Sequence, residues 1–214
     1  MPDGLAAMET LLTQRLAARI LHDLAGPLAT IAAAAGSPGA EDNGLRDDAL
    51  LAETLSLLRL RHRLYAAAFG PGAAISWQEM AELLPSAPGA HRLRFRLALP
   101  ADLPAPREGM GGLLLSALLL AAEALPRGGM ITLTLAAGAA DRAFLILPEG
   151  QGARWPHGFL DLLAGRDQPP EAATPRGVLA PWLVALAAAQ RCRLALAMGP
   201  SGQAAPLLIQ PARE

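Results

Sequence analysis

The stretch Arg15–Ile31, RLAARILHDLAGPLATI, decides the fold of the first third of the chain. Apolar side chains recur at helical spacing in and just before it, at Leu12, Leu16, Ile20, Leu24, Leu28 and Ile31. This period is typical of an amphipathic helix. We therefore predict one long helix from about Leu5 to Ala35, ended by the glycines and proline of the segment 36–44.

A second long helix is predicted to begin between Asn43 and Arg46 and to end at Phe69, because Gly70 and Pro71 follow it. Two long helices joined by a short polar turn form an antiparallel hairpin. A single hairpin leaves apolar surface uncovered. We therefore expect a homodimer in which two hairpins form a four-helix bundle.

The pattern changes after Pro71, and we place the domain boundary near Gly70 to Ala74. The sequence SWQE at Ser76–Glu79 predicts a capped short helix, and LRFRLAL at Leu93–Leu99 alternates as a half-exposed strand does. Longer helices are predicted near 107–125 and 178–190, with further strands near 131–135, 143–147, 193–197 and 206–209. The expected fold is α+β: a helical hairpin over residues 1–70, then a two-layer α/β sandwich over 74–214.

Composition excludes several classes of protein. The chain has 18 basic and 19 acidic residues, with a formal charge of −1, which disfavours a broad nucleic-acid-binding face. It contains no lysine, so neither a Walker-type phosphate lysine nor a Schiff-base lysine is available. Cys192 is the single cysteine, and no metal-ligand spacing is apparent. We expect a cytoplasmic protein without a structural metal or a membrane span.

The pair His22-Asp23 lies inside the first predicted helix. At 100° per residue, His22 points about 200° away from Ile20 and therefore away from the apolar stripe. Small residues surround it one turn away, and arginines flank the same surface: Ala18, Ala25, Gly26, Ala29, Arg15 and Arg19. Such a face gives clearance to a nucleophile that must meet another protein, and guanidinium groups favour a phosphoryl group.

Pro27 breaks a local rule beside this pair. Its ring nitrogen cannot donate to the carbonyl of Asp23, so we expect the helix to bend or loosen there, and a disruption of this kind often marks a working site. A different interpretation is open: exposed helical histidines are common, and a proline can simply end a helix.

The string His22-Asp23-Leu24-Ala25-Gly26-Pro27 resembles the phosphoacceptor motif of histidine-kinase dimerisation domains. The later stretch LLLSALLLAAEALPRGGMITLTL is similar to a segment of the kinase ATP-binding domain, the Bergerat fold. Kinases need asparagines in that helix, where this chain has Ser116 and Leu120. Their Asp-x-Gly-x-Gly loop corresponds to the segment 148–152, PEGQG, in which proline replaces the aspartate.

An intact phosphoacceptor joined to a degenerate ATP-type domain resembles the ChpT-like histidine phosphotransferases, as do the segments EALPRGG, 150–154 and 174–196. The resemblance implies that His22 accepts a phosphoryl group from the receiver domain of a hybrid histidine kinase and passes it to response regulators. Asp23 is then a helper that orients the imidazole or accepts its proton. The resemblance also implies that the protein binds no ATP and has no cofactor of its own, and that the receiver domain supplies Mg²⁺.

In an antiparallel hairpin turning near residue 40, the level of His22 is matched by Leu58 to His62. Arg59, Arg61 and His62 would then add positive potential near the site, or form a solvated basic face. Two alternatives to the phosphotransferase stay open: an active histidine kinase with an unusual ATP site, and a non-catalytic dimeric interaction module in which His22 is incidental.

Overall fold

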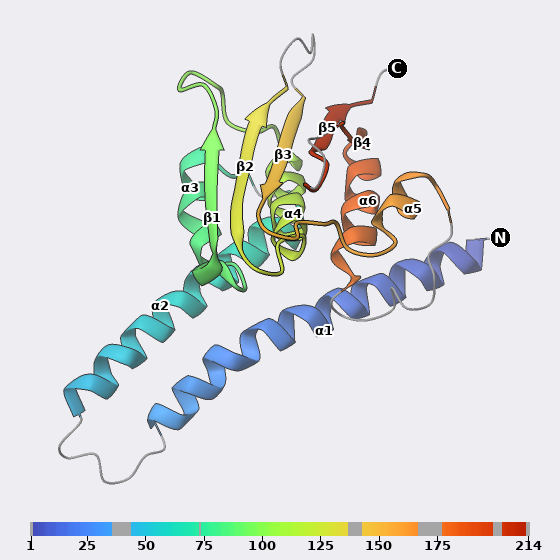
Figure 1. Cartoon of the computed structure of the whole chain (residues 1–214). Helices are drawn as coiled ribbons and strands as arrows, with labels where there is room; N and C mark the ends of the chain where they lie inside the picture. The colour runs from blue at the N-terminus through green and yellow to red at the C-terminus, as the bar shows by residue number, and fades with distance from the viewer. Residues whose placement is uncertain are drawn as a thin grey trace.

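The computed structural model describes residues 2–35, 44–72, 74–136, 143–166, 177–198 and 203–212. Its first two helices, α1 (Pro2–Ala35) and α2 (Gly44–Phe69), confirm the predicted hairpin. Figure 1 shows them side by side at one end of the hairpin, which extends away from the rest of the molecule. The segment 36–43, where the helix break was predicted, lies outside the described residues.

The apolar stripe of α1 faces inward as predicted. Leu16 is buried, and Ile20 and Leu24 pack against the core, whereas Leu28, counted in the same repeat, is 51% exposed. Each helical step turns the side chain by 100°, so residue 28 has drifted off the stripe. The helix continues through Pro27 to Ala35 without interruption.

A mixed five-stranded sheet forms the second part of the molecule, with strand order β1-β2-β3-β5-β4. Strands β1 and β2 are parallel, and the remaining pairs are antiparallel. The strands are β1 (Leu93–Ala98), β2 (Gly129–Leu135), β3 (Phe144–Glu149), β4 (Cys192–Leu196) and β5 (Leu207–Pro211). The ends of all five strands lie within two residues of the predicted ends. Alternation of apolar and polar residues is a local pattern and could therefore be read from the sequence.

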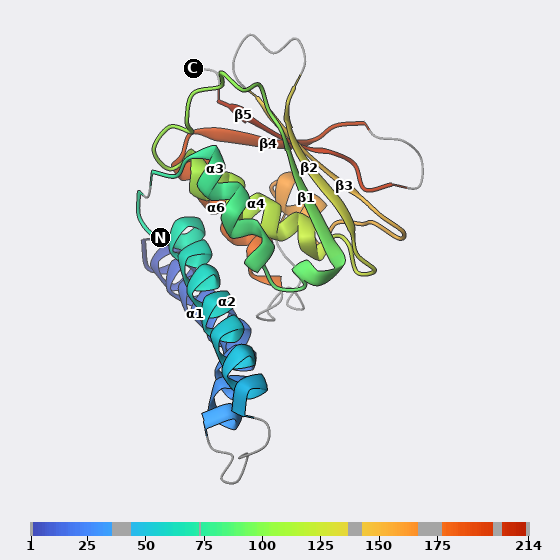
Figure 2. The same cartoon turned by 90° about the vertical axis from the view of Figure 1, so that its left-hand side faces the viewer.

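Helices cover one face of this sheet (Figure 2). They are α3 (Trp77–Leu83), α4 (Met110–Glu123), α5 (Phe159–Leu163) and α6 (Leu179–Ala189), with short 3₁₀ turns η1 (Leu84–Ser86) and η2 (Ala90–Arg92). Helix α3 begins with the predicted capping box, since Ser76 and Glu79 exchange side-chain and backbone hydrogen bonds. The five-residue helix α5 was not predicted. It lies in a stretch interrupted by Pro156, Gly158 and Gly165 that has no room for helical periodicity.

Helix α4 is the centre of the core. Eight consecutive residues, 113–120, are buried between the sheet and helices α2 and α6. The inward faces of the strands complete this core with alternate residues, including Phe95, Ile131, Leu133 and Ile146. A helix that is apolar on all sides is typical of such a central position.

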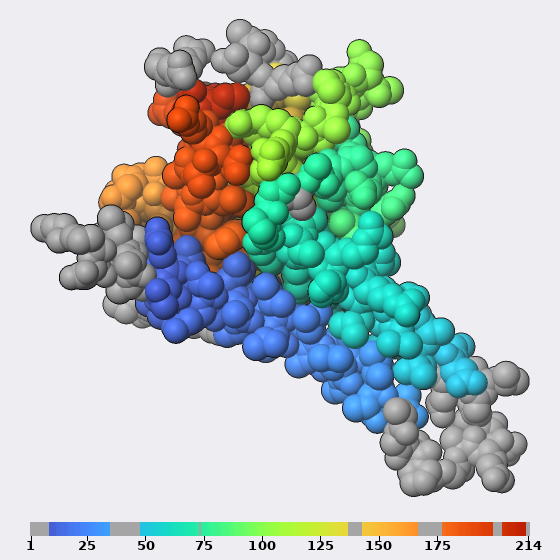
Figure 3. Space-filling model, turned by 180° about the vertical axis from the view of Figure 1, so that it is seen from behind, coloured from blue at the N-terminus to red at the C-terminus, as the bar shows by residue number. Residues whose placement is uncertain are grey.

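The second part is fastened directly to the hairpin. Within α4, the buried Ser116 hydroxyl donates to the carbonyl oxygen of Ala68 in the last turn of α2, at 3.0 Å. Helix α6 lies against α1, as Figure 3 shows from behind. No helix among the described residues has the length and apolar character needed to cross a membrane.

Candidate functional site

His22 lies on the outward surface of α1, as its position in the helical repeat predicts. Its side chain is 69% exposed. The small residues predicted to surround it, Ala18, Ala25, Gly26 and Ala29, are all exposed, and a methyl group added to Gly26 would meet nothing within 4 Å. The ring therefore projects from a smooth stretch of helix that another protein can approach closely.

Asp23, the next residue, points in a different direction. Its side chain is only 9% exposed. One carboxylate oxygen, Oδ2, accepts hydrogen bonds from Arg19 Nε and from the Tyr65 hydroxyl of α2, each at 2.7 Å. The other oxygen, Oδ1, lies 3.3 Å from His22 Nδ1. The carboxylate thus connects the exposed ring to buried donors on both helices of the hairpin.

This environment keeps Asp23 ionised. Burial, the largest single cause, would raise its pKa, but the hydrogen bond and charge of Arg19 together with the hydrogen bonds of Tyr65 and His22 outweigh burial, so the pKa lies below its usual value. Burial, followed by the charge of Asp23, raises the pKa of Tyr65 well above its usual range. Near neutral pH, Asp23 is therefore a carboxylate and Tyr65 a hydrogen-bond donor.

The contact between His22 and Asp23 selects one tautomer of the ring. A carboxylate can only accept a hydrogen bond, so a neutral imidazole facing Asp23 Oδ1 carries its proton on Nδ1. The second nitrogen, Nε2, is then unprotonated and has its lone pair available on the solvent side. In this tautomer Nε2 is the ring nitrogen with a free lone pair, which is the form in which an imidazole can act as a nucleophile.

Pro27 has a partner that compensates for its missing amide proton. The carbonyl oxygen of Asp23, which a residue at position 27 would ordinarily bond, instead accepts from Arg61 Nη1 at 3.0 Å. Arg61 Nε also donates to the carbonyl of Ser86 in η1, at 2.8 Å. A side chain of α2 therefore satisfies the acceptor that the proline leaves open, and the predicted disruption is repaired rather than expressed as a break.

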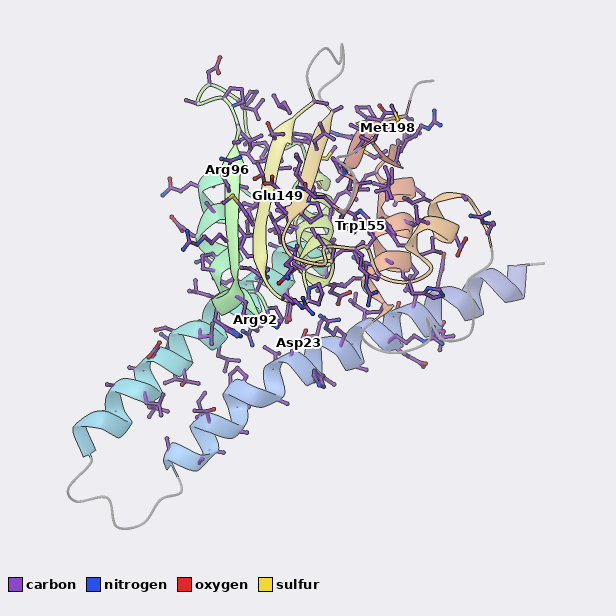
Figure 4. All side chains as sticks on the ribbon, viewed as in Figure 1. Asp23, Arg92, Arg96, Glu149, Trp155 and Met198 are labelled. Carbon is purple, nitrogen blue, oxygen red and sulfur yellow. The ribbon has the colours of Figure 1, made fainter. Side chains whose placement is uncertain are left out.

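A cleft of about 890 Å³ lies beside His22, between α1 and the second part of the molecule. His22, Asp23 and Arg19 line one side, and Arg92, Leu119, Glu123, Arg154, Trp155 and His157 line the other. Figure 4 shows Asp23 on α1, with Arg92 and Trp155 above it on the second domain. A ligand or partner surface that reaches His22 from this side therefore meets additional cationic side chains.

The remaining predicted site residues occupy three kinds of position. Arg15 is half-buried on α1, and Arg19 is nearly buried, pairing with Asp23 and, at 2.6 Å, with Glu123 Oε1 of α4. Arg61 is turned inward toward backbone carbonyls. Arg59 and His62 are exposed on α2 and do not line the cleft.

Five residues of this neighbourhood with ionisable side chains were not predicted as part of the site: Tyr65, Arg92, Glu123, Arg154 and His157. Arg92 is the last residue of η2, and His157 lies between β3 and α5. Their approach to His22 depends on how the second domain sits on the hairpin, and sequence spacing carries no signal for that. Tyr65 has a weak signal, because it lies about one turn beyond the segment of α2 predicted to match His22.

The residues at the positions that resemble nucleotide-binding positions of kinases, Ser116, Leu120 and Pro148, are all buried in this structure. Leu120 is completely buried, and Ser116 uses its hydroxyl to bond Ala68. Pro148 is a buried residue of β3, whereas Glu149 is exposed. In the described ranges, no three His, Cys, Asp or Glu side chains come together in a way that could hold a metal ion.

Comparison with known proteins agrees with this architecture. The structure of a bacterial phosphotransferase at 1.7 Å resolution has a TM-score of 0.71 at 22% identity, over 92% of this chain and 94% of that one, which shows a shared fold. The structure of full-length ShkA in complex with AMPPNP has a TM-score of 0.46 at 21% identity, over 95% of this chain and 45% of that one. Acinetobacter baumannii histidine kinase AdeS gives 0.42 at 13%, over 90% and 94%. No curated protein matches the chain.

The family comparison is more specific. The model of the histidine phosphotransferase C-terminal domain matches residues 77–202, which is more than half of the 214 residues. The match covers the strands β1 to β4 and the helices α3 to α6, and it ends before β5. The chain therefore belongs to the histidine phosphotransferases, of the ChpT-like kind that its sequence resembles.

Proposed function

We propose that this protein relays a phosphoryl group between receiver domains through Nε2 of His22. The donor is an aspartyl phosphate on the receiver of a hybrid histidine kinase, and the acceptor is the aspartate of another response regulator. The observation that carries this proposal is the exposed ring of His22, whose Nδ1 lies against Asp23 Oδ1 at 3.3 Å. That contact leaves Nε2 free for attack.

The transfer balances without a co-reactant. The lone pair of Nε2 attacks the phosphorus atom, the P–N bond forms, and the P–O bond to the donor aspartate breaks, releasing its carboxylate. The proton on Nδ1 stays in place against Asp23, and the cationic ring is thereby stabilised. In the second step the acceptor carboxylate attacks phosphorus, and the pair of electrons in the P–N bond returns to Nε2. Both steps depend chiefly on in-line positioning and charge neutralisation.

The surroundings of His22 suit this chemistry. The small exposed residues around the ring give a receiver domain close access, and Arg92 and Arg154 in the cleft supply positive charge toward a phosphoryl group. The proposal assigns the Mg²⁺ ion to the receiver domain. Arg15 and Arg59 contribute, at most, to the long-range potential that steers an acidic partner.

The second domain acts in this proposal without a nucleotide. The buried leucine at position 120 and the buried proline at position 148 offer no ligand to Mg²⁺ or to adenine. A buried Ser116 already bonded to Ala68 has its donor occupied. These contacts favour a phosphotransferase over a kinase.

The hairpin is proposed to dimerise. Large apolar side chains stand exposed on both of its helices, at Leu11, Leu21, Leu28, Leu50 and Leu55. A second copy of the hairpin would cover such residues in a four-helix bundle. Light scattering coupled to size exclusion measures the mass directly, and a mass of one chain at micromolar concentration contradicts the dimer.

The decisive experiment is label capture from a ³²P-labelled receiver domain. We expect the wild-type chain to take up label and the His22→Ala variant to take up none, because the proposal places the P–N bond on Nε2 of His22. His62→Ala, an exposed histidine of α2 outside the cleft, is the matched control and should behave as wild type. Absence of wild-type labelling would favour the interaction module, whereas labelling from ATP alone would favour the kinase.

A further inference from the structure

We propose that Glu123 of the second domain and Tyr65 of α2 are positioning residues for His22. They act through Asp23, and their role is to hold that carboxylate so that Oδ1 faces the ring. The second domain would then complete the phosphoacceptor site rather than serve only as a docking or bracing module. The effect on transfer rate rests on the proposed function, but the effect on the imidazole tautomer does not.

The two oxygens of Asp23 are in different surroundings. Oδ2 accepts from Arg19 Nε and from the Tyr65 hydroxyl, each at 2.7 Å. Two such donors on one oxygen fix the rotation of the carboxylate about its terminal bond, which is otherwise broad and roughly two-fold. With Oδ2 held, Oδ1 is directed at His22 Nδ1, 3.3 Å away.

Arg19 is itself held from the other domain. Its Nη1 donates to Glu123 Oε1 at 2.6 Å, and Glu123 is the last residue of α4. The Arg19 side chain is 13% exposed and that of Glu123 20% exposed. A long arginine side chain has many rotamers in solution, and this partly buried ion pair restricts them so that Nε meets Asp23. The chain of contacts runs from α4 to the ring of His22 through two charged side chains.

Tyr65 fixes Asp23 from the opposite helix. Its ring is buried and stacks on Phe69, with centroids 5.5 Å apart. A tyrosine held in this way has a fixed hydroxyl position. Since Tyr65 remains a donor at neutral pH, its bond to Oδ2 persists wherever Asp23 is ionised.

Loss of either positioning residue should loosen the carboxylate and allow the second tautomer of His22. In that tautomer Nε2 carries the proton and cannot attack phosphorus. A wrong tautomer lowers the rate of transfer without removing the nucleophile. Mutation of residues that orient the ligands of a metal typically changes activity 10- to 100-fold, and by the same reasoning we expect a slowing of about tenfold here.

The test uses the full chain with Tyr65→Phe and Glu123→Gln, two substitutions that keep shape. The control is Glu149→Gln, an exposed carboxylate at the end of β3 that does not line the cleft. Long-range ¹H–¹⁵N spectra at about pH 8, where an imidazole is neutral, report which nitrogen of each ring carries the proton. The signals of His22 are identified among those of the four histidines by their loss in His22→Ala.

In the wild type and the control, we expect the ¹⁵N chemical shifts of the two ring nitrogens of His22 to differ widely, with the proton on Nδ1. In both test variants the separation should shrink, and single-turnover capture of label should slow about tenfold while still reaching the wild-type end point. Thermal unfolding is followed in parallel. If Glu123→Gln does not fold, Tyr65→Phe decides, because it removes one oxygen and retains the stacked ring.

The outcomes separate the two proposals. Folded variants that keep the wild-type nitrogen shifts overturn the positioning role, whether or not label is captured. A wild type that captures no label, together with variants whose shifts move as expected, overturns the relay and leaves the positioning role standing. If the ¹⁵N shifts of His22 also move in Glu149→Gln, the change is not specific to this chain of contacts. That result would also overturn the positioning role.

Discussion

The surroundings of His22 and the interior of α4 differ in how the hydrogen bonds of their buried polar groups are satisfied. Beside His22, the carboxylate of Asp23 accepts hydrogen bonds from Arg19 of α1 and from Tyr65 of α2, and Arg19 in turn donates to Glu123 of α4. Along α4, Leu120 is a completely buried apolar side chain, and the buried Ser116 hydroxyl donates to the carbonyl oxygen of Ala68.

The difference shows what keeps a buried polar group in a protein. A buried polar side chain is tolerated when its hydrogen bonds are made, and it is costly when they are not. Around His22 the partners are present in the chain itself. In α4 the buried position 120 holds leucine, which packs in the core and needs no hydrogen-bond partner.

The largest effect is expected from Leu120→Asn, which attempts to restore a kinase-like ligand. The side chain is completely buried, so we expect a loss of about 3–5 kcal/mol in the free energy of unfolding, from the lost packing and the unbonded amide. No gain of ATP-analogue binding is expected by titration calorimetry with Mg²⁺.

Leu160→Asn is the matched control for that variant, because Leu160 of α5 is 61% exposed and should cost less than about 0.5 kcal/mol. A stable Leu120→Asn variant that binds the analogue would break the comparison, since the interior of α4 would then be a functional nucleotide site lacking a single group.

A smaller effect is expected from Arg61→Ala, which removes the bonds to the carbonyls of Asp23 and Ser86. We expect a loss of about 2–3 kcal/mol, because both bonds come from a charged donor. Pro27→Ala restores an amide proton for the Asp23 carbonyl. In that background the cost of Arg61→Ala should fall by about 1 kcal/mol, measured as the coupling in a double-mutant cycle from urea unfolding.

An additive cycle would contradict the compensation between Arg61 and Pro27. The exposed Arg59→Ala, two residues earlier on α2, provides the control and should leave the free energy of unfolding within about 0.5 kcal/mol of the wild type in both backgrounds.

The smallest effect concerns pH and Asp23. Asp23→Asn should cost about 1–2 kcal/mol near neutral pH, because Arg19 keeps its bond to Glu123. The pKa of Asp23 in the folded chain lies below the ordinary value of 3.8, so the carboxylate stabilises the fold fully above that value. The contribution is lost as the pH falls through the lower pKa of the folded state.

The ¹³Cγ shift of Asp23 measures this directly. We expect a titration midpoint below 3.8 in the wild type and a higher midpoint in Tyr65→Phe, which lacks one of the donors to Oδ2. A midpoint at or above 3.8 in the wild type would mean that burial outweighs the donors.

Much of the fold could be predicted from periodicity. The hairpin helices, the strand β1 and the capping box at Ser76 each depend on neighbours within a few residues, and each appears where the sequence predicts it. The outward direction of His22 follows from the same local geometry. The part of α2 that lies level with His22 could also be predicted, since Arg61, which donates to the Asp23 carbonyl, lies within the predicted segment 58–62.

The parts that could not be predicted depend on long-range packing. Glu123 pairs with Arg19 across 104 residues of chain, and no local pattern indicates that contact. Arg92 and His157 reach the cleft only because the sheet domain sits above α1. The role of Arg61 was left between a phosphate environment and a solvated face, and the structure turns it inward because Pro27 leaves an acceptor open.

The two contacts of α4 with the hairpin have a mechanical consequence. Ser116 bonds the end of α2, and Glu123 pairs with Arg19 of α1, so one helix is tied to both helices of the hairpin at separate points. A Gly-Pro-Gly connection after Phe69 would, on its own, leave a domain free to swivel. Because α4 contacts both helices at separate points, rotation of the sheet part about the connection after Phe69 would break at least one of these two contacts. We therefore expect the sheet part and the hairpin to move as one body.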